Sequence, residues 1–419
     1  MPNYPQPGFP FAKIYFGDVE VTTFPDLSLM SFEYNRQEKA GGGNTVNFTL
    51  LDQEWDSLEI LLLDVEGQIK FEYGWIDEYG PSKSWSKRYA MVCQKYQIRI
   101  TNEHTEMIVE GITDGISEVD TKEDHIVRGQ TDKVYPSRIS DFVIKVYTDL
   151  GFDVSGVEKT DKFERRFIRP DSTLADYQEN IVSGINPTQL IQQELKHRTT
   201  GENSTQGGYY LYFEDDEVKK KVFLVRSWVP KGSLKTFYIP EGLEYEVITF
   251  EPDINMKAMK VGEGMSQKAL RGLAHQRGRA TVDTFRHKIN SGLAAPEFQL
   301  DYTNKDGANN SPMNQNQIDA ASTAREAKQA NVSFYSDRSK YINNATLVIV
   351  GDPMYRINDF ITIIVRKSGA GGGGLHYTTG VYRITGIKES ISPGTYQTTF
   401  TLRKHVEADK IFKRFFGMT

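Results

Sequence analysis

Four consecutive acidic residues form the densest group of potential cation ligands in the sequence: Glu214, Asp215, Asp216 and Glu217. Adjacent carboxylates suit Ca²⁺ or Mg²⁺, because both ions prefer oxygen ligands. The surrounding residues lack the ligand spacing of a calcium-binding loop and the glycine that its sharp turn requires. The pattern therefore favours a charged, solvated turn between two strands over a metal site.

Two glycine-rich segments, residues 41–43 and 369–374, have the composition of phosphate-binding loops. A nucleotide-binding loop of that kind ends in Lys followed by Ser or Thr, and it opens a helix. Neither segment has this ending, and neither precedes a helical pattern. We therefore predict flexible hairpin loops, since glycine adopts backbone conformations that other residues avoid.

Catalytic signatures built on His, Cys or Ser are incomplete. None of the seven histidines has a His or Cys partner at metal-ligand spacing. His104, Thr105 and Glu106 begin like a zinc deaminase signature, but the Pro-Cys-x-x-Cys that should follow is missing. The Gly-x-Ser-x-Gly of hydrolases is missing too, although a Ser, His and Asp that meet only in the fold leave no local pattern. We predict no catalytic, cofactor-binding or metal site.

Bulk composition limits the possible partners. The 419 residues carry a formal net charge of -6, which argues against a chain dominated by phosphate binding. The basic run at residues 268–288 has only Phe285 as an interleaved aromatic residue, so we favour a solvated face over nucleic-acid binding. The single cysteine, Cys93, excludes an internal disulfide and lies in an apolar run that predicts a core position. Two acidic residues interrupt the longest apolar-rich run, residues 58–65, so we expect a cytoplasmic chain without a membrane span.

Four strands are predicted near the C-terminal end, over residues 345–350, 360–365, 381–387 and 396–402. β-branched and aromatic residues fill these segments, and Gly, Pro, Asp and Ser bound them. Side chains alternate along a strand, so Tyr396, Thr398, Phe400 and Leu402 share one face of the last strand. This block is expected to form the half-buried wall of a barrel or sandwich.

A second β-rich block has predicted strands at residues 11–16, 18–23, 45–51, 68–75, 90–101 and 105–111, and a short helix at 52–63. Tyr96, Ile98 and Ile100 alternate with polar residues and are expected on a dry face. Two strands, a polar loop at residues 77–87 and two more strands repeat the order of the C-terminal block. The repeat predicts an internal duplication, with chance coincidence as the alternative.

Helical periodicity appears between the two blocks. Apolar residues from Ile139 to Leu150 recur at helical spacing, and Gly151 is a typical helix end. Further helices are predicted from Ser172 and from Asn186, and a hairpin joins strands 209–213 and 218–225 across the acidic turn. Residues 262–331 are polar with an Ala-rich, helical second part, and they are predicted to be an ordered excursion or a segment that orders on assembly.

The predicted fold is mainly β with an inserted α+β domain. We expect a first β-barrel domain at residues 1–124, an α+β middle domain at 125–240, a second β-barrel domain at 241–261 and 332–408, the polar excursion at 262–331 and an aromatic tail at 409–419. Phe412, Phe415 and Phe416 are costly to leave exposed at a chain end. The tail is therefore predicted to dock, either on this chain or on a neighbour.

Two motifs of the C-terminal block resemble the tail hub proteins of contractile bacteriophages, a group that includes the late control protein D family and the myovirus baseplate hub. The first is Gly351-Asp352-Pro353 followed by an aliphatic strand. The second runs over residues 380–387 and 394–402 as Gly-x-Tyr-x-Ile-x-x-Ile and Gly-x-Tyr-x-Thr-x-Phe-x-Leu. The resemblance covers the end of the chain well and the rest only by the order of its elements.

This resemblance implies a homotrimer with two tube-like barrels per chain. Three chains then present six similar edges, so a trimeric hub can join a sixfold tail tube to a threefold central spike. The implied partners are the tail tube protein, the central spike protein, the C-terminus of the tape measure protein and other baseplate proteins, with DNA only passing through the channel. The implied location is the baseplate of the virion tail, after assembly in the host cytoplasm.

The resemblance gives the glycine loop a role and leaves alternatives. Gly371, Gly372 and Gly373 are expected to form a flexible interface tip that adjusts between tube and hub. The rival functions are a tail-associated cell-wall hydrolase and the hub of a tail-like bacteriocin or bacterial injection system. We favour a structural hub that is not an enzyme and needs no cofactor.

Overall fold

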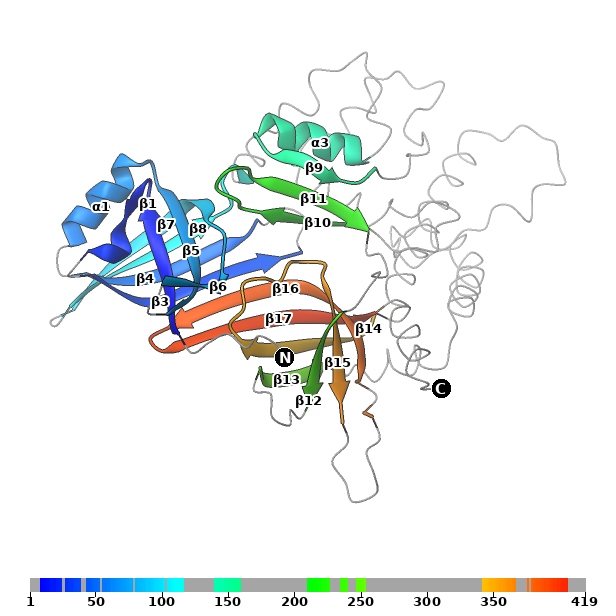
Figure 1. Ribbon diagram of the computed structural model, residues 1–419. Helices are drawn as coiled ribbons and strands as arrows, with labels where there is room; N and C mark the ends of the chain where they lie inside the picture. Colours follow the sequence, from blue (N-terminus) through cyan, green and yellow to red (C-terminus); the bar gives the residue numbers. More distant parts are fainter. Residues whose placement is uncertain are drawn as a thin grey trace, which may run out of the picture.

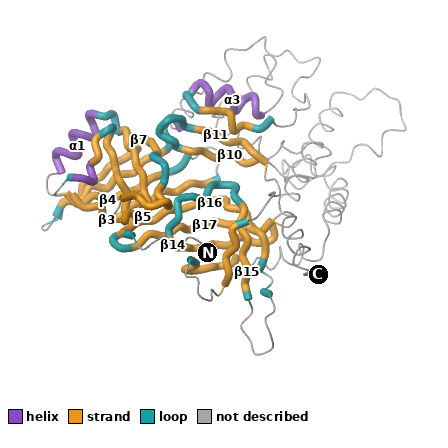
Figure 2. The backbone as a smooth tube through the Cα atoms, in the orientation of Figure 1, coloured by secondary structure: helices purple, strands orange, loops and turns teal. Residues whose placement is uncertain are grey.

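The computed structural model of the chain describes residues 8–24, 27–38, 43–52, 55–77, 80–101, 104–116, 139–159, 209–226, 234–239, 246–253, 341–366, 375–376 and 378–405. This part of the chain is mainly β, as predicted. It contains a 14-stranded sheet and a three-stranded sheet. Figure 2 shows strands throughout the described part, with the helices α1 and α3 lying at its periphery.

The N-terminal β unit is built on six strands with the spatial order β3-β4-β8-β7-β5-β1. The strands are β1 (Phe9–Phe16), β3 (Leu27–Gln37), β4 (Thr45–Asp52), β5 (Gln68–Asp77), β7 (Tyr89–Ile100) and β8 (Thr105–Ile112). Shorter elements are β2 (Val19–Glu20), the 3-10 helix η1 (Val21–Thr23), α1 (Trp55–Asp64) and β6 (Gly80–Trp85). Alternating side chains of these strands fill a core in which Phe32, Phe71 and Tyr73 are fully buried, each contributing about 1.5–3 kcal/mol.

The C-terminal β unit has six strands in the order β13-β14-β17-β16-β15-β12. They are β12 (Lys235–Ile239), β13 (Val247–Asp253), β14 (Tyr341–Val350), β15 (Phe360–Val365), β16 (Gly380–Ser392) and β17 (Thr395–His405). The four strands predicted for this block are confirmed. Tyr396, Thr398, Phe400 and Leu402 lie on the buried face of β17, each at most 2% exposed.

The middle unit carries the helix and hairpin that the sequence predicts. The helix α3 (Ile139–Asp149) lies over a sheet of β9 (Asp153–Val157), β10 (Tyr209–Glu214) and β11 (Lys221–Arg226), as Figure 1 shows. Its side chains Val143 and Tyr147 belong to the core shared with this sheet. β10 and β11 are antiparallel, and β9 runs parallel to β11. Both faces of β10 are covered, because Tyr212 joins the core of the C-terminal β unit.

One antiparallel pairing joins the two β units into a single sheet. β3 pairs with β16 over six residues, from Gly386 opposite Gln37 to Ile391 opposite Phe32. In Figure 1 the blue strands of the first unit therefore run beside the orange and red strands of the second. Ile391 and Tyr396 of the C-terminal unit also belong to the core of the N-terminal unit.

The two β units repeat the same register as well as the same strand order. β5 pairs with β7 over four residues, from Gln68↔Val92 to Phe71↔Tyr89, and β15 pairs with β16 over four, from Phe360↔Arg383 to Ile363↔Gly380. The next pairings, β7 with β8 and β16 with β17, also match. The register of each shifts once, between Cys93 and Lys95 in β7 and between Ile384 and Gly386 in β16. A second shared shift lies between Leu29 and Ser31 in β3 and between Val247 and Thr249 in β13.

Backbone conformation supports this correspondence. Within the described residues, Glu66 and Asn358 are the two non-glycine residues with positive φ, at 51° and 72°, and each stands two positions before an equivalent strand, β5 or β15. The units also differ, since β1 lies antiparallel to β5 whereas β12 lies parallel to β15, and β14–β17 has a register shift between Tyr341 and Asn344 that β4–β8 lacks. The internal duplication predicted from strand order is thus present in the strand pairing.

Several predicted elements need correction. Residues 18–23 form β2 and η1 instead of one strand, and the predicted polar loop at 77–87 contains β6. Strands β3, β9, β12 and β13 were not predicted. The helices from Ser172 and Asn186, the 262–331 excursion and the 409–419 tail lie outside the described residues. The proposed domain boundaries stay predictions.

Candidate functional site

The candidate site is a group of charged side chains enclosed where the three units meet, called the buried junction below. Its centre is an ion pair between β3 and β16, with Arg36 Nη2 3.0 Å from Glu389 Oε1. Glu389 is 0% exposed and Arg36 is 6% exposed. Strand alternation places them there, because Arg36 shares a face with buried Phe32 and Tyr34, and Glu389 shares one with Ile387 and Ile391.

Further hydrogen bonds surround this ion pair. The other oxygen of Glu389 accepts bonds from the Tyr396 hydroxyl at 3.0 Å and the Thr398 hydroxyl at 2.6 Å. Arg36 Nη1 donates to the backbone carbonyl of Tyr355 at 3.1 Å. Burial raises the pKa of Glu389 to about 7, although the Arg36 charge and the two hydroxyls act to lower it. A buried pair with this many partners fixes the relative position of its strands.

The acidic turn after β10 is the second part of the junction. Asp215 is 0% exposed, and its Oδ2 accepts hydrogen bonds from the Tyr34 hydroxyl at 2.8 Å and Asn44 Nδ2 at 2.7 Å. Asn44 Nδ2 also donates to the Phe213 carbonyl at 3.0 Å. Burial raises the pKa of Asp215. The prediction of a solvated turn is therefore wrong for Asp215, whose side chain turns inward and ties the middle unit to β3 and β4.

The remaining acidic residues of this turn form ion pairs with the N-terminal β unit. Lys87 Nζ lies 3.2 Å from Glu214 and 2.8 Å from Asp216, and Lys70 Nζ lies 3.0 Å from Glu217. The cluster thus docks one unit on another instead of collecting its carboxylates around a cation. No group of three His, Cys, Asp or Glu side chains suited to a metal occurs among the described residues.

A second buried arginine crosses the junction from β16. Arg383 is 0% exposed, and its Nη1 donates to Glu38 Oε2 at 2.5 Å and to Asn358 Oδ1 at 3.3 Å. Its guanidinium lies 3.9 Å from the ring centroid of Tyr210 on β10, a cation–π contact. Arg383 therefore contacts the end of β3, the loop before β15 and the middle unit at once.

The Gly-Asp-Pro motif has a physical role in the loop between β14 and β15. The Gly351 carbonyl accepts a hydrogen bond from Trp75 Nε1 of β5 at 2.8 Å, and the Asp352 N–H donates to the Thr398 hydroxyl at 2.9 Å. The Tyr396 ring lies so close to Gly351 that a Cβ there would stand 2.1 Å from Tyr396 Cγ. Only glycine allows the loop to approach the ring that also binds Glu389.

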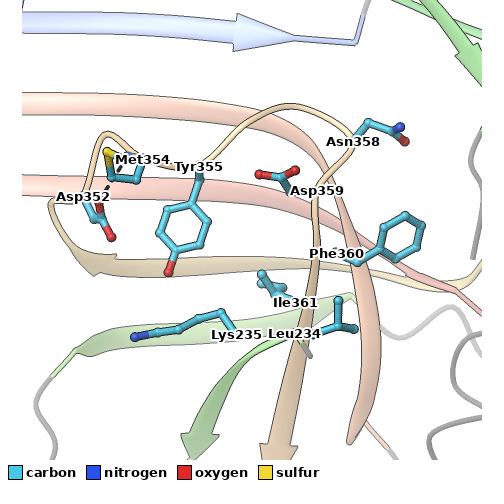
Figure 3. Close-up of a pocket in the computed structure, with 9 residues that line it drawn as sticks. All are labelled: Leu234, Lys235, Asp352, Met354, Tyr355, Asn358, Asp359, Phe360 and Ile361. Atoms are coloured by element: carbon cyan, nitrogen blue, oxygen red, sulfur yellow. Dashed lines mark hydrogen bonds between the residues drawn. The ribbon is translucent and has the colours of Figure 1, made fainter. Parts of the chain in front are cut away.

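The same loop borders a pocket of about 600 Å³ (Figure 3). Nine residues line it: Leu234, Lys235, Asp352, Met354, Tyr355, Asn358, Asp359, Phe360 and Ile361. Both carboxylates accept bonds from the loop's own backbone, Asp352 from Met354 N–H at 3.1 Å and Asp359 from Arg356 N–H at 2.8 Å. Figure 3 shows the Tyr355 ring between these carboxylates. Each carboxylate therefore helps to shape the loop.

The remaining sequence predictions concern the glycine loop, the aromatic tail, Cys93 and membrane spans. Gly371, Gly372, Gly373, Phe412, Phe415 and Phe416 lie outside the described residues, so their interface role stays a prediction. Cys93 is half-buried and packs against the N-terminal core. No described helix is long and apolar enough to cross a membrane. Sequence reasoning missed Arg36, Glu389 and Arg383, since nothing local distinguishes them from surface charges.

The junction carries a testable pH dependence through Glu389. Its pKa is 4.5 in an unfolded reference and about 7 in the folded chain, so the folded chain binds this proton more tightly. The stability that Glu389 contributes is thus complete below pH 4.5 and is lost as the pH rises through about 7. Glu389→Gln, which stays neutral, is expected to remove about 2–3 kcal/mol of the decrease in unfolding free energy between pH 5 and pH 8. Urea unfolding at both pH values checks this, and an unchanged pH slope would refute it.

No protein-family model matches the chain, and no curated protein matches it either. Solved structures do resemble it. A 43 kDa tail protein of prophage MuSo2 from Shewanella oneidensis shares 10% identity over 93% of this chain and 95% of its own, with a TM-score of 0.46. A tail protein from Neisseria meningitidis shares 8% identity over 94% of this chain and 96% of its own, with a TM-score of 0.47.

A third similar structure belongs to another kind of machine. It is an E. coli protein described as a component of the type VI secretion system with structural similarity to T4 bacteriophage tail proteins. It shares 8% identity over 94% of this chain and 77% of its own length, with a TM-score of 0.45. The resemblance to phage tail proteins that the sequence predicts is thus also found among solved structures.

Proposed function

We propose that the chain is the structural baseplate hub of a contractile phage tail, a trimeric adapter that joins the sixfold tail tube to the threefold central spike. The observation that carries the proposal is the repeat of one six-stranded unit, with shared register shifts, inside a single continuous sheet. A chain with two similar units can match sixfold symmetry with three copies. The adjacent tail tube, spike, tape measure C-terminus and other baseplate proteins are the proposed partners.

The buried junction supports a structural role rather than a catalytic one. Glu389, Asp215 and Arg383 are all 0% exposed and each contacts at least one element distant in sequence, so a substrate cannot reach them. The hydrogen bonds and ion pairs of these three residues hold the units in one fixed arrangement. A hub that transmits force between tube and spike needs such fixed geometry. The hub of a tail-like bacteriocin or bacterial injection system would use the same geometry.

The first test is the mass of the purified chain in solution. Light scattering is expected to give three times the 47.7 kDa of one chain, because a ring of six similar units needs three copies. A chain that stays monomeric and never enters tails when mixed with tube and spike proteins would contradict the proposal. Peptidoglycan release by the isolated chain, abolished by one carboxylate or His substitution, would favour the rival hydrolase.

A further inference from the structure

We propose that the outer edge of β13 in one copy pairs with the outer half of β7 in a second copy, repeating between chains the β3–β16 pairing found within one chain. The pairing itself follows from the internal duplication, and the number of copies in the assembly rests on the proposed trimeric hub. The partner is a second copy of this chain, and the paired surfaces are residues 95–100 of β7 and residues 250–253 of β13.

The duplication makes the two pairings comparable. The register shift shared by β3 and β13 makes Phe32, Glu33, Tyr34 and Asn35 equivalent to residues 250–253. The shift shared by β7 and β16 makes residues 95–100 equivalent to residues 386–391. Those are the β16 residues that pair with β3. Whatever geometry lets β16 accept β3 is therefore present again where β7 could accept β13.

Both equivalent edges are open in the described part of the chain. β7 pairs with β5 only as far as Val92, and no described strand continues along that side of β7. β13 is the last strand at its end of the sheet. Such edges expose a row of backbone donors and acceptors that readily pair with another strand.

The predicted register brings compatible side chains together. It places Gln97 opposite Asp253 and Arg99 opposite Glu251. The within-chain pairing has a diagonal charge pair on these strands, since Lys388 Nζ of β16 lies 2.7 Å from Glu33 of β3, although Lys388 stands opposite Asn35 and Glu33 opposite Ser390. The unit of sheet stabilisation is such a cross-strand pair, and opposite charges favour it.

The same register also sets the positions of the apolar residues and of the proline on the two edges. It places Ile100 opposite Phe250 and Ile98 opposite Pro252. Proline is confined to edge strands and bulges, and it brings no N–H. Pro252 therefore contributes no donor to the pairing, in which it stands opposite Ile98.

Apolar side chains left exposed near these edges gain a partner. Ile100 is 67% exposed, against the prediction of a dry face along β7, and Ile248 of β13 is 45% exposed. Ile60 and Leu63 of α1 are each 60% exposed. The Tyr96 hydroxyl donates to Glu59 of α1 at 2.7 Å, so this helix lies beside the open half of β7.

The position of α1 in the first unit corresponds to that of the β14–β15 loop in the second, because each connects equivalent strands. That loop already packs on the neighbouring unit, where Trp75 and Arg36 donate to its carbonyls. The exposed face of α1 is accordingly expected to pack on the C-terminal β unit of the next copy. The contact joins two different surfaces of the chain. Repeated from copy to copy, such a contact forms a closed ring when the rotations between neighbouring copies add up to a full turn.

Disulfide trapping tests the register directly in the full chain with Cys93→Ser. Directly opposed antiparallel residues have Cα atoms about 4.5–5.5 Å apart, within the range that a disulfide spans. Arg99→Cys with Glu251→Cys is expected to crosslink between copies, giving a band of three copies and none larger on non-reducing electrophoresis. The matched within-chain pair, Glu33→Cys with Ser390→Cys, should crosslink inside one copy. Gln97→Cys with Thr249→Cys, displaced by four residues, should stay reduced.

The outcomes separate the pairing from the proposed trimer. Crosslinks that continue into ladders longer than three copies would support the pairing and contradict the trimeric hub. A trimer by light scattering whose Arg99→Cys, Glu251→Cys variant crosslinks no better than the displaced pair would overturn the pairing and leave the trimer standing. In a second arm without cysteines, Arg99→Glu should lower the fraction of assembled chain, and adding Glu251→Arg should restore it. An assembled fraction that Arg99→Glu leaves unchanged would also overturn the pairing.

Discussion

Replacing Arg36 by Met is expected to lower the free energy of unfolding at pH 8 by about 3–5 kcal/mol. The substitution leaves the Glu389 carboxylate enclosed without its cation, 3.0 Å away in the native chain, and removes the hydrogen bond to the Tyr355 carbonyl. The loss should be smaller at pH 5, where Glu389 binds a proton and no buried charge needs a partner. Urea unfolding and native-state hydrogen exchange of the β3 and β16 amides measure it.

A matched control lies on the same two strands. The Lys388–Glu33 ion pair is 2.7 Å long, but its side chains are 45% and 42% exposed. Lys388→Ala should therefore cost only about 0–1 kcal/mol. If Arg36→Met and Lys388→Ala cost the same, the buried junction is not what holds the two β units together.

Replacing Gly351 by Ala is expected to cost about 3–5 kcal/mol, through overpacking and a lost hydrogen bond. The added Cβ stands 2.1 Å from Tyr396 Cγ. Cγ is bound to the Cβ of its own residue, so the ring cannot swing away without moving β17. Movement of the ring displaces the Tyr396 hydroxyl, which then loses its 3.0 Å hydrogen bond to Glu389. Trp75, whose ring centroid is 5.7 Å from that of Tyr396, should report the change in its fluorescence.

Gly394 supplies the control in the neighbouring turn. It has a φ of +76°, and a Cβ there would meet nothing within 4 Å. Gly394→Ala should cost only about 1 kcal/mol, from the left-handed backbone alone. A Gly351→Ala protein that unfolds at the same urea concentration as Gly394→Ala would show that the close approach to Tyr396 does not matter.

The strands of the C-terminal block were predictable because β-branched and aromatic residues fill them and turn residues bound them. From Tyr396 to Leu402 of β17, buried side chains alternate with less buried ones without interruption. β3 was missed for a physical reason, since the register shift between Leu29 and Ser31 changes which parity is buried partway along the strand. The sequence of β6, Gly-Pro-Ser-Lys-Ser-Trp, has no apolar alternation to detect. This strand pairs only with the end of β5.

The candidate site was much harder to foresee. A charged residue in a strand normally marks the solvent face, so Arg36, Glu389 and Arg383 carry a misleading local signal. Their partners are remote in sequence, as the pairing of Arg36 with Glu389 illustrates. The acidic turn shows the same limit, because four adjacent carboxylates give no hint that Asp215 alone is enclosed. Burial of these groups follows from the arrangement of three units, which no single segment encodes.

The most direct test of the hub assignment is a low-resolution reconstruction of the purified, assembled chain. We expect threefold symmetry with a central pore surrounded by six similar lobes, two from each copy. A twofold or asymmetric particle, or a ring whose lobes do not alternate between the two β units, would contradict it.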